Sequence, residues 1–300
     1  MPWLQTIFEA NAEQITILED VLPELGAAAI TLEDNANQPL YEPPLGTQPL
    51  WENTRVIGLF EATADMDLVT ALLKPYFKNG LPAFRVEILE DQNWEQVWME
   101  RFKPMPMGKR LWICPSWCAP PEPEAVNVLL DPGMAFGTGT HPTTALCLEW
   151  LDSANLQGKV LIDYGCGSGI LAVAACLLGC DKVWAVDNDP QALLSCKDNA
   201  EKNGVADILH IASPETFAKS FQGEANIIIA NILAAPLQQL APALLQFLAP
   251  NGHLVLSGIL TAQENEVKQA YHPQINFSPV KQREEWIRLD GKKDLNPPEK

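Results

Sequence analysis

The chain has 300 residues, of which 47% are hydrophobic and 19% charged, so it is long enough for two folded domains and too apolar for a disordered protein. Its net charge of −18 excludes general electrostatic binding to nucleic-acid phosphates, because such binding requires clustered Lys and Arg. The longest apolar run, residues 170–180, has 11 residues, whereas a membrane span needs about 20, so we expect neither a nucleic-acid nor a membrane partner. The first residues lack a basic segment and reach Glu9 early, which predicts no signal peptide and a cytoplasmic protein.

The first hundred residues alternate strand and helix patterns. Asn11 is predicted to cap a helix, because Gln14 stands at the capping-box position and apolar residues then recur at helical spacing. Strands are expected over 3–9, 28–32, 55–62 and 84–89, helices over 11–26 and 67–77, and a long Pro-, Asn- and Gln-rich loop over 35–53. This β-α-β-β-α-β order is typical of small α+β (ferredoxin-like) domains, and we predict one over residues 1–100.

The negative charge is concentrated in this first part. Residues 1–100 hold 17 acids and 4 bases, a net charge of −13, whereas residues 101–300 carry −5. The charge is either a solubilising surface or an acidic face that docks a basic protein partner.

A change in composition near residue 100 predicts a domain boundary. Residues 101–130 are interpreted as a linker, since a possible helix over 94–102 and a short strand over 110–114 are followed by a proline cluster over 115–123. From residue 131 to 293 strands and helices alternate, and the strands are apolar throughout, which indicates a mostly parallel sheet covered on both faces. We expect strands over 160–164, 183–186, 208–212, 227–232, 253–256, 277–281 and 286–289, and helices over 143–151, 170–178, 190–203, 236–248 and 261–271. Residues 294–300 are predicted to be a disordered tail.

The seven cysteines form no metal-binding pattern. Two pairs are spaced C-x3-C and none C-x2-C, while the four histidines lie far apart. We therefore predict buried, reduced thiols and no metal site.

A glycine-rich turn is the strongest chemical signal. Residues 163–169, Asp-Tyr-Gly-Cys-Gly-Ser-Gly, stand between a predicted strand and a predicted helix, where glycines let the backbone approach a ligand. The G-x-G-x-G spacing differs from the dinucleotide fingerprint, and the G-K-[ST] of a phosphate loop is missing. Asp187 ends the next strand, where a carboxylate can accept hydrogen bonds from a ribose diol. This arrangement resembles the S-adenosylmethionine site of class I methyltransferases.

Two further segments flank that site in the predicted topology. Residues 130–144 are rich in Gly and Thr and precede the first strand of the sheet, so they could close over the cofactor, although a turn with a Thr helix cap is the simpler reading. His141 within them is a candidate base, but a role in structuring the loop is favoured. Asn231, in Ala-Asn-Ile-Leu, ends a buried strand beside the glycine turn and would face the methyl donor.

Together these segments resemble the ribosomal protein L-eleven methyltransferase family over nearly the whole chain. The resemblance implies a Rossmann-like class I methyltransferase with a seven-stranded sheet, an N-terminal substrate-recognition domain and S-adenosylmethionine as cofactor. It also implies methyl transfer to lysine side-chain and N-terminal amines of a large-subunit ribosomal protein. By correspondence with the family, cofactor contacts fall on Thr144, Gly165, Asp187 and Asn231. We add Gly167 of the turn and Phe136 of the preceding segment.

Asn231 is the candidate catalytic residue, because its neutral carbonyl can orient an acceptor amine without holding the amine's proton. The family often has Phe at Tyr164 and Asp at Asn226, and neither departure touches a predicted contact.

Other functions fit parts of the pattern. A protein-lysine methyltransferase with another basic target is the nearest alternative, because catalytic motifs report chemistry and not substrate. A small-molecule N-methyltransferase, an NAD-dependent oxidoreductase and a non-catalytic cofactor-binding module are weaker alternatives. The acidic first part argues against a small-molecule substrate, and the glycine spacing argues against an NAD site. The intact set of motifs argues against a module that has lost its catalytic activity.

Overall fold

The computed structural model describes residues 2–36, 38, 50–90, 102–131 and 141–294, and the chain divides into two compact units, Met1–Val97 and Trp98–Lys300. No helix in the described ranges is both long enough and apolar enough to span a bilayer.

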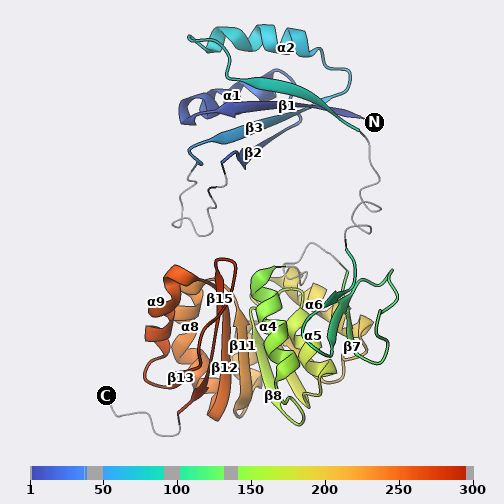
Figure 1. Cartoon of the computed structure of the whole chain (residues 1–300), viewed down its shortest axis with the longest axis vertical. Coiled ribbons are helices and arrows are strands. Elements are labelled where there is room, and N and C mark those ends of the chain that lie inside the picture. Colours follow the sequence, from blue (N-terminus) through green and yellow to red (C-terminus); the bar gives the residue numbers. More distant parts are fainter. Residues whose placement is uncertain (1, 37, 39–49, 91–101, 132–140, 295–300) are drawn as a thin grey trace. The chain divides into compact units, whose positions relative to one another are not determined.

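The first unit is a four-stranded antiparallel sheet covered by two helices (Figure 1). Its elements, in chain order, are β1 (Trp3–Ala10), α1 (Ala12–Glu24), β2 (Ala29–Asp34), β3 (Thr54–Glu61), α2 (Met66–Leu73), the 3-10 turn η1 (Lys74–Tyr76) and β4 (Phe84–Leu89), and the strand order is β2-β3-β1-β4. The predicted capping box is present: the Gln14 amide N–H donates to Asn11 Oδ1 and the Asn11 N–H donates to Gln14 Oε1, both at 3.0 Å. The apolar sides of both helices meet Phe8, Val56 and Phe60 of the sheet.

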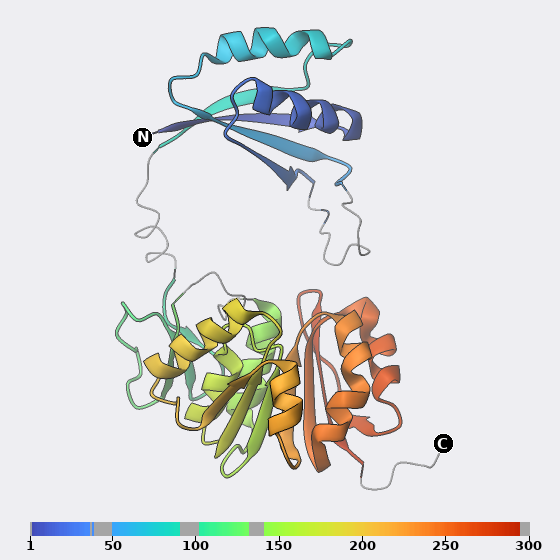
Figure 2. The ribbon, with the colours of Figure 1, turned by 180° about the vertical axis from the view of Figure 1, so that it is seen from behind.

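The second unit is built on an eight-stranded sheet with helices on both faces (Figures 1 and 2). Its strand order is β10-β9-β8-β11-β12-β15-β13, and the short β14 pairs with β15 beside this path. The five strands from β10 to β12 run parallel, whereas β15 is antiparallel to β12, β13 and β14. The strands are β8 (Val160–Tyr164), β9 (Lys182–Val186), β10 (Leu209–Ala212), β11 (Ala225–Asn231), β12 (Leu248–Leu260), β13 (Ile275–Phe277), β14 (Lys281–Arg283) and β15 (Trp286–Lys293). The predicted mostly parallel sheet is confirmed, with one strand more than the predicted seven.

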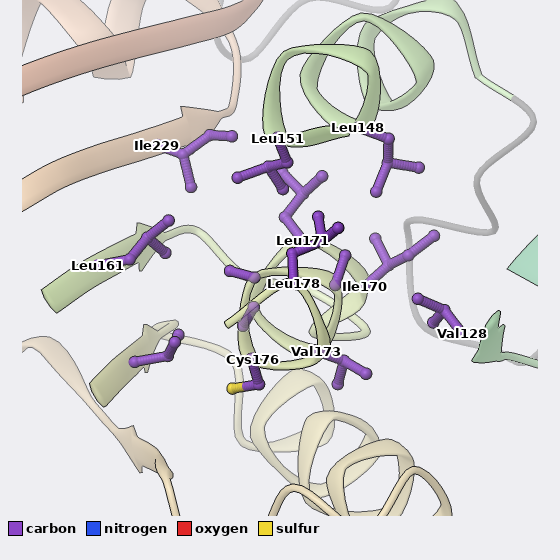
Figure 3. Packing of buried hydrophobic residues seen from close by; sticks show 14 of the residues in the cluster. Val128, Leu148, Leu151, Leu161, Ile170, Leu171, Val173, Cys176, Leu178 and Ile229 are labelled. Carbon is purple, nitrogen blue, oxygen red and sulfur yellow. The ribbon is translucent and has the colours of Figure 1, made fainter. Parts of the chain in front are cut away.

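Alternation along each buried strand divides the core into two layers. In β9, Val183 and Ala185 contact the layer under α4, α5 and α6, while Trp184 and Val186 contact the layer under α7, α8 and α9. Figure 3 shows the first layer, where Leu148 and Leu151 of α4 lie over residues of α5 and the sheet. The helices are α4 (Pro142–Ser153), α5 (Ile170–Leu177), α6 (Pro190–Lys202), α7 (Pro214–Ser220), α8 (Ala234–Phe247) and α9 (Glu264–Tyr271), with the 3-10 turn η2 (Thr261–Gln263) before α9.

The segment interpreted as a linker folds with the second unit where it is described. It forms a small sheet of β5 (Met105–Pro106), β6 (Leu111–Cys114) and β7 (Val126–Leu129). Leu111, Ile113 and Val128 join the core layer of α4 and α5. These strands have two to four residues, too few for a periodic pattern in the sequence, which is why only one of them is predicted. The predicted helix over 94–102 and the predicted tail lie almost entirely outside the described residues.

Two smaller expectations need correction. The strand predicted over 277–281 is two strands, β13 and β14, separated by residues 278–280. The helix α7, capped by Ser213, was not predicted, because its seven residues hold too few apolar positions to show a helical period. All seven cysteines are free thiols and six of them are buried, as predicted.

Candidate functional site

Three of the predicted site residues meet at one edge of the large sheet. β9, β8 and β11 are neighbours and parallel, so their carboxyl ends lie together. The glycine turn follows β8, Asp187 follows β9, and Asn231 is the last residue of β11. Residues separated by more than sixty positions in sequence are thereby brought to one place.

The turn after β8 depends on glycine at defined positions. Gly165, Gly167 and Gly169 have φ of 79°, 53° and 77°, a conformation that costs other residues free energy. A Cβ on Gly165 would stand 2.3 Å from Ile232 Cγ2, so this position also lacks space for a side chain. The N–H groups of Gly165 and Cys166 donate to the Val186 carbonyl at 2.7 and 3.1 Å, which ties the turn to the end of β9.

Asp187 is fixed against this turn. Its Oδ2 accepts the Gly167 N–H at 2.9 Å and its Oδ1 accepts the Asp189 N–H at 3.0 Å. Each carboxylate oxygen can accept a second hydrogen bond, so the pair remains able to bind two hydroxyl groups. The Gly167 N–H thus holds in place the carboxylate that is predicted to bind the ribose.

Asn231 is held by a residue from a distant helix. Its Nδ2 donates to Thr144 Oγ1 at 3.2 Å, a contact between residues 87 positions apart. Thr144 is fully buried in the first turns of α4. The hydrogen bond fixes the amide, and the Asn231 carbonyl oxygen is then the atom left to accept a hydrogen from an amine.

His141 is a structural residue of the helix start. It stands at the N-cap of α4, where its Nδ1 lies 2.7 Å from Thr143 Oγ1 and accepts from the Thr143 N–H, and Pro142 follows at the first helical position. The cap is therefore His141 and not the Thr expected from the sequence. Burial lowers the pKa of His141, against the opposing effect of Glu284 and Glu285. Phe136 lies outside the described residues, with the rest of 132–140.

Asp163, the first residue of the glycine-rich motif, is a further residue of the site that was not predicted. It is fully buried at the end of β8. Its Oδ2 accepts the Ala172 N–H at 3.1 Å, and its Oδ1 has no hydrogen-bond partner among the residues that the structure describes. Burial, with a contribution from the Asp187 carboxylate, raises the pKa of Asp163 to about 7. A buried, half-satisfied carboxyl group beneath the turn is suited to neutralise a cationic ligand. The position of an acid directly before G-x-G is the sequence signal for it.

The strand order, with its antiparallel β15 between β12 and β13, and the glycine turn and acid at the carboxyl edge together define a class I methyltransferase. The family model for ribosomal protein L11 methyltransferase (PrmA) matches residues 2–294, so the chain belongs to the ribosomal protein L11 methyltransferase family.

Relatives with the same family name align with this chain over nearly their whole length. The chain is 50% identical over 291 residues to a ribosomal protein L11 methyltransferase of Tolumonas auensis, covering 97% of this chain and 99% of the relative. It is 49% identical over 298 residues to that of Pseudomonas aeruginosa, covering 98% and 99%. A solved structure of ribosomal protein L11 methylase from Lactobacillus delbrueckii matches with a TM-score of 0.59 at 30% identity, over 64% of this chain and all of that chain.

Proposed function

We propose that this protein transfers methyl groups from S-adenosylmethionine to lysine side-chain and N-terminal amines of ribosomal protein L11 in the cytoplasm. The observation that carries the proposal is Asn231, an amide fixed by Thr144 at the same sheet edge as the glycine turn and Asp187. The relatives named for this activity, aligned almost end to end with the chain, support the choice of substrate.

The residues at the edge fit a cationic nucleoside cofactor. Asp187 has lone pairs for a ribose diol, and Gly165 and Gly167 allow the tight backbone turn beside it. The Asp163 carboxyl beneath the turn, whose Oδ1 lacks a partner in the described part of the chain, suits a positive group. S-adenosylmethionine, when bound, supplies an electrophilic methyl group on a sulfonium sulfur. We assign its contacts to Gly165, Gly167 and Asp187.

For methyl transfer, the acceptor lysine of the substrate must lose its proton, because only the neutral amine is a nucleophile. With a lysine pKa of about 10.4, about one amine in a thousand is neutral near pH 7.4, which corresponds to about 4 kcal/mol. A carboxylate at position 231 would stabilise the ammonium form and increase this cost. The Asn231 carbonyl can accept one N–H of the amine and direct its lone pair toward the donor without that penalty.

Mass spectrometry on defined substrates tests the function. Purified enzyme is incubated with deuterated S-adenosylmethionine and unmethylated ribosomal protein L11, with other basic ribosomal proteins in parallel. Label on lysine and N-terminal amines of L11 alone is expected. Label on a different basic protein would retain the chemistry and refute the substrate, and absence of label with the donor bound by calorimetry would refute the enzyme.

A further inference from the structure

Two adjoining cavities open at the opposite edge of the large sheet, where the parallel strands begin. The larger has a volume of about 540 Å³ and the smaller about 490 Å³. They share Trp150 at the end of α4, Asn251 and His253 at the start of β12, and Lys292 near the end of β15. The larger also takes in Lys159, just before β8, and Asn226 of β11. Asn231 and Asp187 lie at the carboxyl ends of the strands, so these cavities are separate from the proposed cofactor site.

Among the described residues, the larger cavity is lined by two lysines and a histidine and by no acid. Lys159, Lys292 and His253 face it, in a chain whose net charge is −18. His253 and Lys292 are directly paired across β12 and β15, which places their side chains on one face of the sheet. Within the described part of the chain, neither lysine forms an ion pair with a carboxylate. Unpaired ammonium groups around one cavity favour an anion.

The neutral polar groups of this cavity are arranged as donors. Asn226 Oδ1 accepts the Val160 N–H at 2.9 Å, and Asn155 Oδ1 accepts the Gln157 N–H at 3.3 Å. Because both amide oxygens are already used, the NH₂ groups of these two residues remain to donate. The Trp150 and His253 rings, with centroids 5.6 Å apart, supply an aromatic wall beside the donors.

Of the four charged residues that line the smaller cavity, Asp290, Lys292, Lys293 and Asp294, two are bound within the fold. Asp290 accepts two hydrogen bonds from the Arg288 guanidinium, at 2.9 and 3.0 Å. Lys293 Nζ donates to the Leu245 and Leu248 carbonyls at the end of α8. Burial lowers the pKa of His253, and the ammonium groups of Lys292 and Lys159 act in the same direction against Asp290. Lys292 of the shared wall is thus a charged group that lines both cavities and has no carboxylate partner among the described residues.

We propose that the larger cavity binds an organic phosphate of mononucleotide size. Its phosphate would lie between Lys159, Lys292 and the Asn226 amide, and its ring would lie against Trp150 and His253. The volume lies within the range of ligand sites, and a phosphate monoester carries close to two negative charges at neutral pH. Because α4 carries Trp150 in its last turn and Thr144 in its first, one helix joins this cavity to Asn231.

Calorimetry on the full chain tests the site. S-adenosylhomocysteine is kept saturating so that the adenosine site is filled, and the probes are GMP, ribose 5-phosphate and guanosine. GMP and ribose 5-phosphate are expected to bind, and guanosine to bind at least about tenfold more weakly than GMP, because the phosphate supplies the charge. Raising NaCl from about 50 to about 500 mM should weaken binding of both phosphates.

Matched lysine variants locate the binding. The double variant Lys159→Gln/Lys292→Gln should bind GMP at least about tenfold more weakly, while Lys197→Gln/Lys219→Gln, on the exposed faces of α6 and α7, should stay within about twofold of the unmodified protein. Thermal unfolding and methyl transfer without GMP should match in both variants. Equal GMP binding by the two double variants would refute the site, as would no binding at about 5 mM probe. Binding of an RNA oligonucleotide without binding of mononucleotides would refute the proposed ligand class.

Discussion

At the scale of single residues, the amide of Asn231 can orient the acceptor amine without stabilising its ammonium form, whereas a carboxylate at this position would stabilise it. Thr144 takes the Nδ2 hydrogen bond, so the carbonyl oxygen is fixed for the amine. Asn231→Ala is expected to reduce kcat by about a hundredfold or more, because near-attack geometry is lost, and to change S-adenosylhomocysteine affinity far less. Steady-state kinetics with calorimetry measure both quantities.

Two variants distinguish orientation from simple packing at this site. Asn231→Asp keeps the shape but stabilises the ammonium, so its pH–rate profile should shift to higher pH. Thr144→Val keeps the volume in the buried pocket and removes the acceptor, so kcat should fall while the pH profile stays in place. Full turnover by Asn231→Ala would exclude the orienting role.

The buried carboxyl of Asp163 predicts a pH-dependent stability. Its pKa is raised from 3.8 to about 7 in the folded protein, so the folded state holds this proton more tightly than the unfolded chain. Between these values a rise in pH removes the proton first from the unfolded chain, which destabilises the fold. The free energy of unfolding of Asp163→Asn, relative to the unmodified protein, should therefore rise by up to about 1.4 kcal/mol per pH unit from about pH 4 to about pH 7 and then level off.

Urea titrations across this pH range, without cofactor, measure the Asp163 effect. The same exchange at the exposed Asp207 is the matched control. A difference between Asp163→Asn and the unmodified protein that stays constant from pH 4 to pH 7 would contradict the raised pKa.

At the scale of elements, the residue after β8, Gly165, packs closely against the residue after β11, Ile232. Gly165→Ala meets two obstacles, a φ of 79° and an Ile232 carbon 2.3 Å from the new methyl group. Gly204→Ala meets only the first, since its φ is 66° and no atom lies within 4 Å. We expect Gly204→Ala to cost about 1 kcal/mol of stability and leave donor affinity unchanged, whereas Gly165→Ala displaces the turn and reduces donor affinity by at least about tenfold.

Calorimetry with S-adenosylhomocysteine and thermal unfolding compare the two glycine variants. Equal donor affinities for Gly165→Ala and Gly204→Ala would show that the contact with Ile232 does not position the turn.

Elements with strong local signals could be predicted from the sequence, and contacts between distant elements could not. The Asn11–Gln14 capping box and the apolar strand β8 have their cause in neighbouring residues. The carboxyl edge could be predicted too, because parallel strands end together. The hydrogen bond from Asn231 to Thr144 joins residues 87 apart, and no spacing rule pairs them. The orphaned oxygen of Asp163 likewise depends on what surrounds it in space.

At the scale of the whole molecule, the distribution of charge predicts how the substrate is found. Residues 1–100 carry −13 of the net −18, while the residue proposed to meet the amine is neutral. We propose that the acidic first unit attracts a basic ribosomal protein at long range, and that catalysis is left to a site that does not stabilise the ammonium. Raising ionic strength should then lower kcat/KM for ribosomal protein L11 through slower association, with kcat nearly unchanged.

Matched pairs of acids test where this attraction originates. Glu19→Gln/Glu24→Gln removes two exposed charges from α1, and Glu215→Gln/Glu224→Gln removes two from the second unit. Stopped-flow association at about 0.1 M salt should be slower for the first pair than for the second, because attraction between exposed charges is then screened beyond about 10 Å and only charges near the docking surface contribute. If both pairs slow association equally, the net charge of the protein and not its first unit steers the encounter. If neither does, and kcat/KM is independent of salt, the acidic surface serves solubility alone.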